Sequence, residues 1–228
     1  MKIIKKIKFK ISADGSSASG KTTASKLIAK KFKMKFLSSG NLYRFCALKT
    51  IENNNKYNAK FIKKIVKSIT LKKLDNKKLY NPEVTRLSSI IAKKPFVRNA
   101  LKSFQKNFIK KSSLVVVEGR DIGTKIMPNA DLKLFFTCST KEKAKRRLKE
   151  FKSLDQKISL NQVEKALILR DKEDTERKIS PLIKAKNAVL VDTTKLSLKQ
   201  MEAKLINLVK NSIKKKYGNL QRSKLTSH

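Results

Sequence analysis

A glycine-rich segment near the amino terminus reads Gly15-Ser16-Ser17-Ala18-Ser19-Gly20-Lys21-Thr22. The segment matches the pattern G-x-x-x-x-G-K-[ST] at every fixed position. Residues 6–11 before it alternate between polar and apolar side chains, which predicts a strand, and the apolar residues of 24–32 after it recur at helical spacing. Strand, glycine loop and helix in this order are the context in which the pattern binds phosphate.

The chemistry of the loop suits a nucleoside triphosphate. Gly15 and Gly20 let the backbone adopt positive φ, and the loop N–H groups and the start of the next helix then face an anion. Lys21 is expected to reach the β- and γ-phosphates and the Thr22 hydroxyl to meet Mg²⁺, which is held largely through phosphates and water. We predict that a nucleoside triphosphate is bound by Gly15, Ser16, Ser17, Ala18, Ser19, Gly20, Lys21, Thr22 and Thr23.

The composition excludes several kinds of site. The chain has 228 residues, of which 39% are hydrophobic, so it is expected to fold as one globular domain, or as one with small insertions. It has no apolar run long enough to cross a membrane, and the cytoplasm is the expected location. Two isolated cysteines, Cys46 and Cys138, predict no disulfide framework. The only histidine is His228, which excludes a histidine base and a His/Cys zinc site.

The net charge of +40 has two interpretations. One is nucleic-acid binding, because such a charge attracts any polyanion. The other is a composition biased toward lysine, since the lysines are spread along every expected helix and no nucleic-acid-binding signature accompanies them. We favour the second interpretation and expect no specific nucleic-acid partner.

The remaining pattern predicts an α/β fold with a central parallel sheet of about five strands and helices on both faces. Further strands are expected at 35–38, 114–117, 132–136 and 188–191, with helical spacing between them. Cys138 is expected in the core, residues 72–81 in a small hairpin and 152–158 in a mobile loop. Residues 210–228 form a basic tail with little to bury. Ligands of such a sheet lie beyond the carboxyl ends of its strands.

Arginines stand out in this lysine-rich chain, because their planar fork binds phosphate through two hydrogen bonds. They fall within an ordered series of motifs: Ser39-Gly40-Asn41-Leu42-Tyr43-Arg44, Pro95-Phe96-Val97-Arg98, Glu118-Gly119-Arg120-Asp121-Ile122-Gly123-Thr124, Lys145-Arg146-Arg147 and Arg170-Asp171-Lys172-Glu173-Asp174-Thr175-Glu176-Arg177. With the phosphate loop, this series resembles the bacterial-type cytidylate (CMP) kinases over about residues 5–210.

The resemblance implies an organisation of the chain and a role for each matched position. The kinase domain would span 1–210, with its core at 5–38, 112–140 and 186–210, a monophosphate-binding insert at 39–111 and a lid at about 146–178; the basic tail would be 211–228. Residues implied at CMP are Ser89, Arg98 and Asp121 on the base, Arg170 and Asp174 near the sugar, Arg44, Arg120 and Arg177 on the phosphate, and also Ser39. Arg146 and Arg147 would lie on the lid.

These expectations define a reaction, ATP + CMP → ADP + CDP, with dCMP as a second acceptor. The acceptor phosphate is mostly deprotonated at neutral pH, so no general base is needed. Catalysis would be positioning and charge neutralisation by Lys21, Arg120, Arg177 and Arg146, together with Mg²⁺. A monomer is expected. Two alternatives stay open: another phosphate-loop kinase of a nucleotide or small metabolite, or a basic phosphate-loop protein that associates with nucleic acid.

Overall fold

The computed structural model describes residues 7–152 and 158–223. The chain divides into two compact units, the first comprising Met1–Phe36 and Ser113–His228 and the second Leu37–Ser112. Among the described residues, no helix is both long enough and apolar enough to cross a membrane.

The first unit contains a five-stranded sheet, to which the chain contributes β1 (Phe9–Gly15), β2 (Lys35–Ser38, whose last residues belong to the second unit), β3 (Leu114–Gly119), β4 (Leu132–Thr137) and β5 (Val189–Asp192). The strand order is β2-β3-β1-β4-β5. β1 pairs in parallel with β3 and with β4, so that Ile11 lies opposite Val116 and Leu132. The predicted α/β class with a parallel sheet is confirmed.

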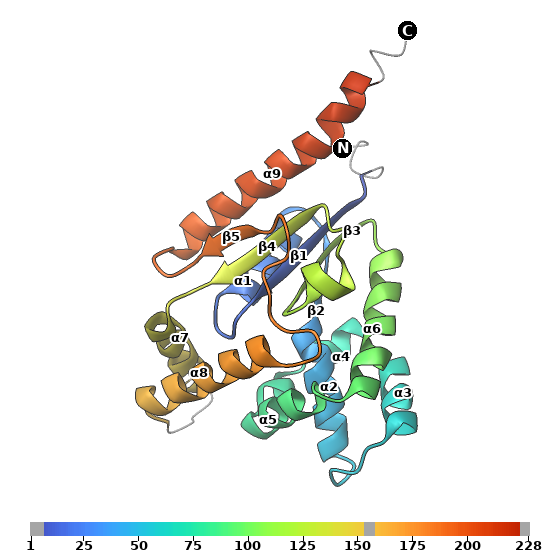
Figure 1. Ribbon diagram of the computed structural model, residues 1–228, viewed down its shortest axis with the longest axis vertical. Coiled ribbons are helices and arrows are strands. Elements are labelled where there is room, and N and C mark those ends of the chain that lie inside the picture. The colour runs from blue at the N-terminus through green and yellow to red at the C-terminus, as the bar shows by residue number, and fades with distance from the viewer. Residues whose placement is uncertain (1–6, 153–157, 224–228) are drawn as a thin grey trace. The chain divides into compact units, whose positions relative to one another are not determined.

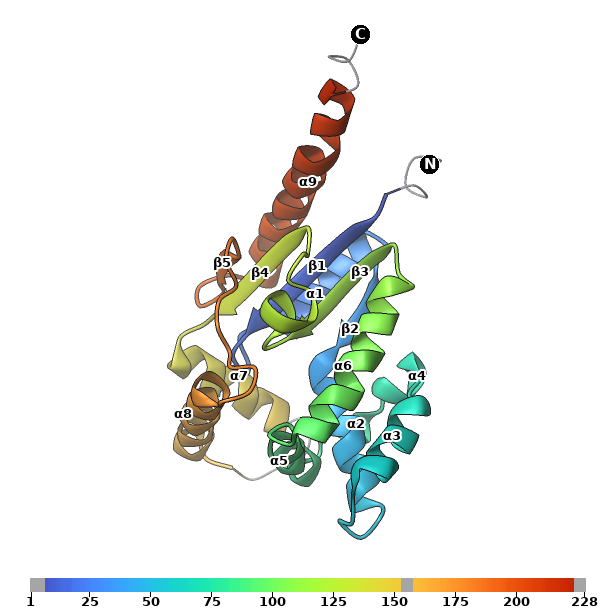
Figure 2. The same cartoon turned by 45° about the vertical axis from the view of Figure 1, so that its right-hand side comes forward.

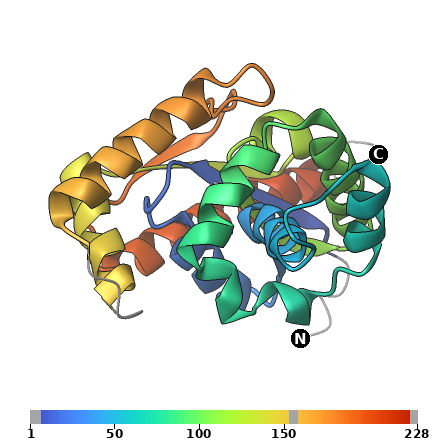
Figure 3. The same cartoon turned by 90° about the horizontal axis from the view of Figure 1, so that it is seen from below.

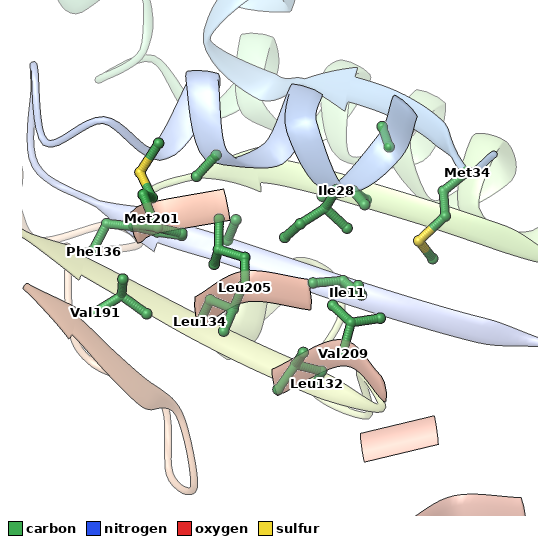
Figure 4. Packing of buried hydrophobic residues seen from close by; sticks show 14 of the residues in the cluster. Ile11, Ile28, Met34, Leu132, Leu134, Phe136, Val191, Met201, Leu205 and Val209 are labelled. Carbon is green, nitrogen blue, oxygen red and sulfur yellow. The ribbon is translucent and has the colours of Figure 1, made fainter. Parts of the chain in front are cut away.

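One face of this sheet is covered by α1 (Lys21–Lys31) and α9 (Leu198–Ser223), which contact each other. Figure 4 shows Ile28 of α1 and Leu205 of α9 pointing toward Ile11 and Leu134 of the strands. All four side chains are buried, which removes a large apolar area from water and fixes α1 directly behind the phosphate loop.

The carboxyl-terminal helix differs from the prediction. Residues 210–228 were expected to bury little, but α9 continues to Ser223 and runs on beyond the strands (Figure 2). Ile213 and Tyr217 pack against the core, and the Tyr217 hydroxyl donates to the Lys8 carbonyl at 2.7 Å. Lys216 pairs with Asp131 at 2.7 Å. Apolar side chains at helical spacing therefore hold this basic segment against the sheet.

The first unit also contains η3 (Ile122–Ile126), α7 (Thr140–Lys152) and α8 (Leu160–Glu176). The helices α7 and α8 lie side by side (Figure 3) around buried Ala144, Val163 and Leu167. The expected loop at 152–158 lies mostly outside the described residues. Cys138 was expected in the core, but it is only half-buried at the end of β4, whereas Cys46 is buried.

The second unit is helical (Figure 1) and consists of α2 (Ser39–Ile51), α3 (Ala59–Lys67), α4 (Leu71–Leu74), η2 (Lys77–Tyr80), α5 (Pro82–Ile91) and α6 (Pro95–Lys110). The predicted hairpin at 72–81 is wrong, because two helical turns occupy this segment. Thr70 caps the first turn and Asn76 the second through side-chain oxygens. Leu74 and Leu79 are buried, so apolar anchoring favours the turns over a strand pair.

Candidate active site

The phosphate loop has the backbone conformation that its glycines predict. Gly15 has φ +154°, and a Cβ there would lie 2.4 Å from the Phe136 carbonyl oxygen. Gly20 has φ +80° and forms the N-cap of α1. These positions require glycine because the chain turns sharply between β1 and α1 beside β4. The turn leaves the N-terminus of α1 at the carboxyl edge of the sheet, where an anion is stabilised.

Internal hydrogen bonds hold the polar side chains of this loop. Ser19 Oγ and Lys21 Nζ both donate to the Ser16 carbonyl, at 2.9 and 3.1 Å. Thr22 Oγ1 donates to Glu118 Oε2 at 2.9 Å, which connects α1 to the end of β3. Burial, and after it the positive charge of Arg120, lowers the pKa of Lys21 to about 7. This ammonium therefore lies where a negative charge would be favourable.

Asp14 fixes the turn that follows β3. Its two carboxylate oxygens accept hydrogen bonds from Ile122 N at 2.8 Å and from Gly123 N at 2.7 Å. Burial raises the pKa of Asp14 to about 6, against the opposing effect of these two hydrogen bonds. The carboxylate thereby anchors the start of η3, directly after Arg120 and Asp121.

Three arginines surround Asp174 on α8. Arg120 Nε donates to Asp174 Oδ2 at 2.7 Å, and Arg177 Nη1 donates to Oδ1 at 3.2 Å. Burial opposes ionisation of this carboxyl, but the charges of Arg120, Arg177 and Arg170 outweigh it and lower the pKa. Burial, and after it the charge of Arg120, lowers the pKa of Arg170 to about 10. Arg170 Nε is buried without a hydrogen-bond partner.

Four basic positions predicted from sequence come together here. Arg120, Arg170 and Arg177 surround Asp174, and the charges of Arg120 and Arg170 also act on Lys21. This cluster carries more positive than negative charge and lies at the phosphate loop. Such an arrangement can bind and neutralise phosphate groups. Asp121 is also buried in this unit.

Arg146 on α7 lies apart from that network. Its guanidinium donates to Thr193 Oγ1 at 3.0 Å and to the Thr193 carbonyl at 2.8 Å, and it pairs with Glu142 at 3.1 Å. Arg147 pairs with Glu150 and lies over the ring of Phe151. Thr193 contacts the Ser19 carbonyl, so Arg146 adjoins the phosphate loop from the side of β5.

In the second unit, Arg44 is buried at 9% exposure on α2. Its Nη1 donates to the Leu79 carbonyl at 2.9 Å and to Thr85 Oγ1 at 2.6 Å, and its guanidinium lies over the Tyr80 ring. The η2 turn that replaces the expected hairpin thus positions this arginine.

The other predicted residues of the second unit lie on α2, α5 and α6. Arg98 is buried, donates to the Ala92 carbonyl at 3.1 Å and lies over the ring of Tyr43. Ser89 is half-buried on α5, and Ser39 is buried in the first turn of α2. The stacked guanidinium and ring of Arg98 and Tyr43 are chemistry that suits a planar polar ligand.

Sequence reasoning gave no role to Lys143 or Asp171, and it included Glu118 only as part of a motif. Lys143 pairs with Asp171, which also accepts from the backbone N–H of Ser17 at 3.2 Å. A carboxylate at the end of a strand could have indicated Glu118. No sequence signal distinguishes Lys143 from the many other lysines.

Fold and loop together define a phosphate-loop α/β nucleotide-binding protein. A family model described as cytidylate kinase matches residues 11–211. The chain is 37% identical to the cytidylate kinase of Thermosipho melanesiensis over 214 residues, which is 90% of this chain and 98% of that protein. It is also 37% identical to the cytidylate kinase of Rickettsia africae over 206 residues, covering 90% and 93%. The chain belongs to the cytidylate kinase family.

Solved structures support the fold alone. TT1252 from Thermus thermophilus superposes with a TM-score of 0.51 at 16% identity, covering 90% of this chain and 97% of that one. An uncharacterized protein from Eubacterium ventriosum gives 0.53 at 12% identity, covering 90% and 99%.

Proposed function

We propose that this protein transfers the γ-phosphoryl group of ATP to CMP, and also to dCMP, as a nucleoside monophosphate kinase. The observation that carries the proposal is the charge cluster at the phosphate loop. In one compact unit, Lys21 is buried within the electrostatic reach of Arg120 and Arg170, while Asp174 orients Arg120. Such an arrangement of positive charge suits phosphoryl transfer, because that reaction depends on positioning and charge neutralisation.

The acceptor is assigned to residues of both units, each considered by itself. In the first unit, Arg120 and Arg177 take the phosphate of CMP, Arg170 and Asp174 the sugar, and Asp121 the cytosine. In the second unit, Arg44 binds the phosphate of CMP, and Ser89 and Arg98 bind the base. Ser39 is also assigned to CMP binding. An acidic group can accept from the exocyclic amine of cytosine, which uracil lacks.

Mg²⁺ fits the oxygen groups beside the loop. Thr22 Oγ1 and Glu118 Oε2 lie 2.9 Å apart, and hydroxyl and carboxylate oxygens suit a hard divalent cation. Within the described part of the chain, no three His, Cys, Asp or Glu side chains gather into a metal cage. The Thr22 hydroxyl would hold the ion together with nucleotide phosphates and water, and the ion would supply charge neutralisation at the β- and γ-phosphates.

The protein groups then have defined tasks. The loop N–H groups bind the donor phosphates, and Lys21 follows the charge of the transferred group. The arginine pair on Asp174 holds the acceptor phosphate in line, while Arg146 on α7 contributes from the lid. The acceptor oxygen is already deprotonated near neutral pH, so no side chain removes a proton.

A coupled assay of ADP formation across CMP, dCMP, UMP and AMP tests the proposal. CMP should give the highest kcat/KM, followed by dCMP. If UMP or AMP exceeds CMP, the base assignment fails, and another nucleotide kinase of the same fold replaces it. If no monophosphate is turned over while RNA binds in a salt-dependent way, the nucleic-acid alternative replaces it. Light scattering tests the expected monomer.

A further inference from the structure

The helices α7 and α8 contact the phosphate loop at two adjacent residues. Ala18, at φ +55°, packs against the small apolar cluster formed by Ala144, Val163 and Leu167. Its neighbour Ser17 donates its backbone N–H to Asp171 Oδ1 at 3.2 Å. An apolar and a polar contact therefore connect the loop to both helices.

The polar contact uses a group that the loop needs for its ligand. Backbone N–H groups of a phosphate loop bind phosphate oxygens, and the N–H of Ser17 here meets a carboxylate oxygen. A carboxylate resembles phosphate in charge and in accepting such hydrogen bonds. Asp171 and a nucleotide phosphate cannot both occupy this N–H with good geometry.

The counter-ion of Asp171 is internal to the helix pair. Lys143 of α7 donates to Asp171 Oδ2, and its side chain is 8% exposed. Because a buried ammonium is costly without a partner, Lys143 favours keeping the Asp171 carboxylate close to α7. The pair thus presents a fixed carboxylate to the loop.

We propose that Asp171 is a positioning residue that competes with the nucleotide phosphate for the N–H of Ser17. This rests on the proposed binding of ATP at the loop. Phosphate entry displaces the carboxylate, and Lys143 leaves with it. Arg170 and Asp174 belong to the same helix as Asp171, so displacement also changes the position of the groups assigned to CMP. Occupancy of the donor site is thereby coupled to the acceptor residues.

The test measures direct binding of ATP and of inorganic tripolyphosphate by calorimetry, with no acceptor present. Asp171→Ala should bind both probes about 10-fold more tightly, as expected when a charge-assisted hydrogen bond no longer competes. Glu176→Gln is the matched control, because it removes one negative charge from an exposed position of the same helix. It should leave both affinities within about twofold of the wild type.

A double variant separates competition from a second explanation, in which unpaired Lys143 simply attracts phosphate. Asp171→Ala with Lys143→Gln should bind tripolyphosphate about 10-fold more tightly than Lys143→Gln alone. Equal affinity of those two proteins, or weaker binding by Asp171→Ala than by the wild type, overturns the proposal. If Asp171→Ala does not fold because Lys143 is left unpaired, the double variant carries the comparison.

The outcome is independent of the acceptor. If the wild type binds ATP but phosphorylates no CMP, the proposed function fails while this comparison stands. If CMP is phosphorylated but Asp171→Ala binds ATP no more tightly, the competition fails while the proposed function stands.

Discussion

Arg120 and Asp174 connect the end of β3 to α8 through a hydrogen bond of 2.7 Å from Nε to Oδ2. Their side chains are 15% and 16% exposed, so the pair is shielded from water. Arg177 takes the other oxygen of the same carboxylate. One acidic group on α8 therefore orients two guanidinium groups that lie 57 positions apart in the sequence.

Replacing Arg120 should affect catalysis far more than folding. We expect Arg120→Ala to lower kcat/KM for CMP by roughly 10³ or more, because an arginine that stabilises the transferred charge contributes that much. Asp174 keeps Arg177 as a partner, so the variant should still fold. Steady-state kinetics and a thermal melt of the same sample measure both effects.

Two variants sharpen this result. Arg120→Lys keeps the charge but loses the planar fork, and it should recover only a small part of the activity. Arg86→Ala removes an exposed arginine of α5 and should leave kcat/KM nearly unchanged. Full activity of Arg120→Ala would contradict the role of Arg120 in phosphoryl transfer.

The phosphate loop could be predicted from sequence because its function depends on local backbone conformation. Gly15 and Gly20 encode positive φ within eight consecutive residues, and their neighbours encode a strand and a helix. The parallel sheet could also be predicted, because short continuous apolar runs are typical of strands that are buried on both faces.

Contacts between distant residues could not be predicted in this way. Asp171 meets Ser17 across 154 positions, and its partner Lys143 belongs to the most abundant charge type in the chain. At 72–81 a polar pattern concealed two buried leucines, Leu74 and Leu79, whose packing decides for helical turns. At 72–81, tertiary burial therefore overrides a weak local preference.

Nucleotide binding should take up a proton at Lys21. Burial and the charge of Arg120 lower its pKa to about 7, and triphosphate would raise that pKa by adding negative charge. At pH 8 Lys21 is mostly neutral until phosphate binds, so ATP affinity should fall as pH rises above 7, by at most about tenfold per pH unit.

Calorimetry at pH 8 in two buffers of different ionisation enthalpy measures this uptake. The wild type should bind a fraction of one proton with ATP, and Lys21→Met should bind none from this site. Proton release by the wild type, or the same uptake by Lys21→Met, would show that another group titrates.

Asp14 should make folding stability depend on pH in the opposite sense to most carboxylates. Burial raises its folded pKa to about 6 from 3.8, so the folded state holds an extra proton between these values. Its contribution is fully present below about pH 4 and is lost as pH rises through 6. The loss is at most about 3 kcal/mol.

Urea unfolding from pH 4 to 7 measures this effect when the wild type is compared with Asp14→Asn. The difference in unfolding free energy between the two proteins should shift against the wild type as pH rises. A difference that stays constant would contradict the raised pKa, because the amide does not titrate.

Alanine at the two loop glycines should separate steric clash from backbone strain. At Gly20 the new Cβ would lie 3.5 Å from its nearest neighbour, so Gly20→Ala costs only the positive φ, about 1–2 kcal/mol. At Gly15 the Cβ would lie 2.4 Å from the Phe136 carbonyl, so clash adds to strain and the cost exceeds about 3 kcal/mol. Gly40→Ala on α2 has neither problem and should be neutral or stabilising.

Urea unfolding of the three variants measures these costs. Midpoints in the order Gly40→Ala, Gly20→Ala, Gly15→Ala, from highest to lowest, support this account. A Gly15→Ala protein as stable as Gly20→Ala would mean that β4 moves away from the loop at little cost.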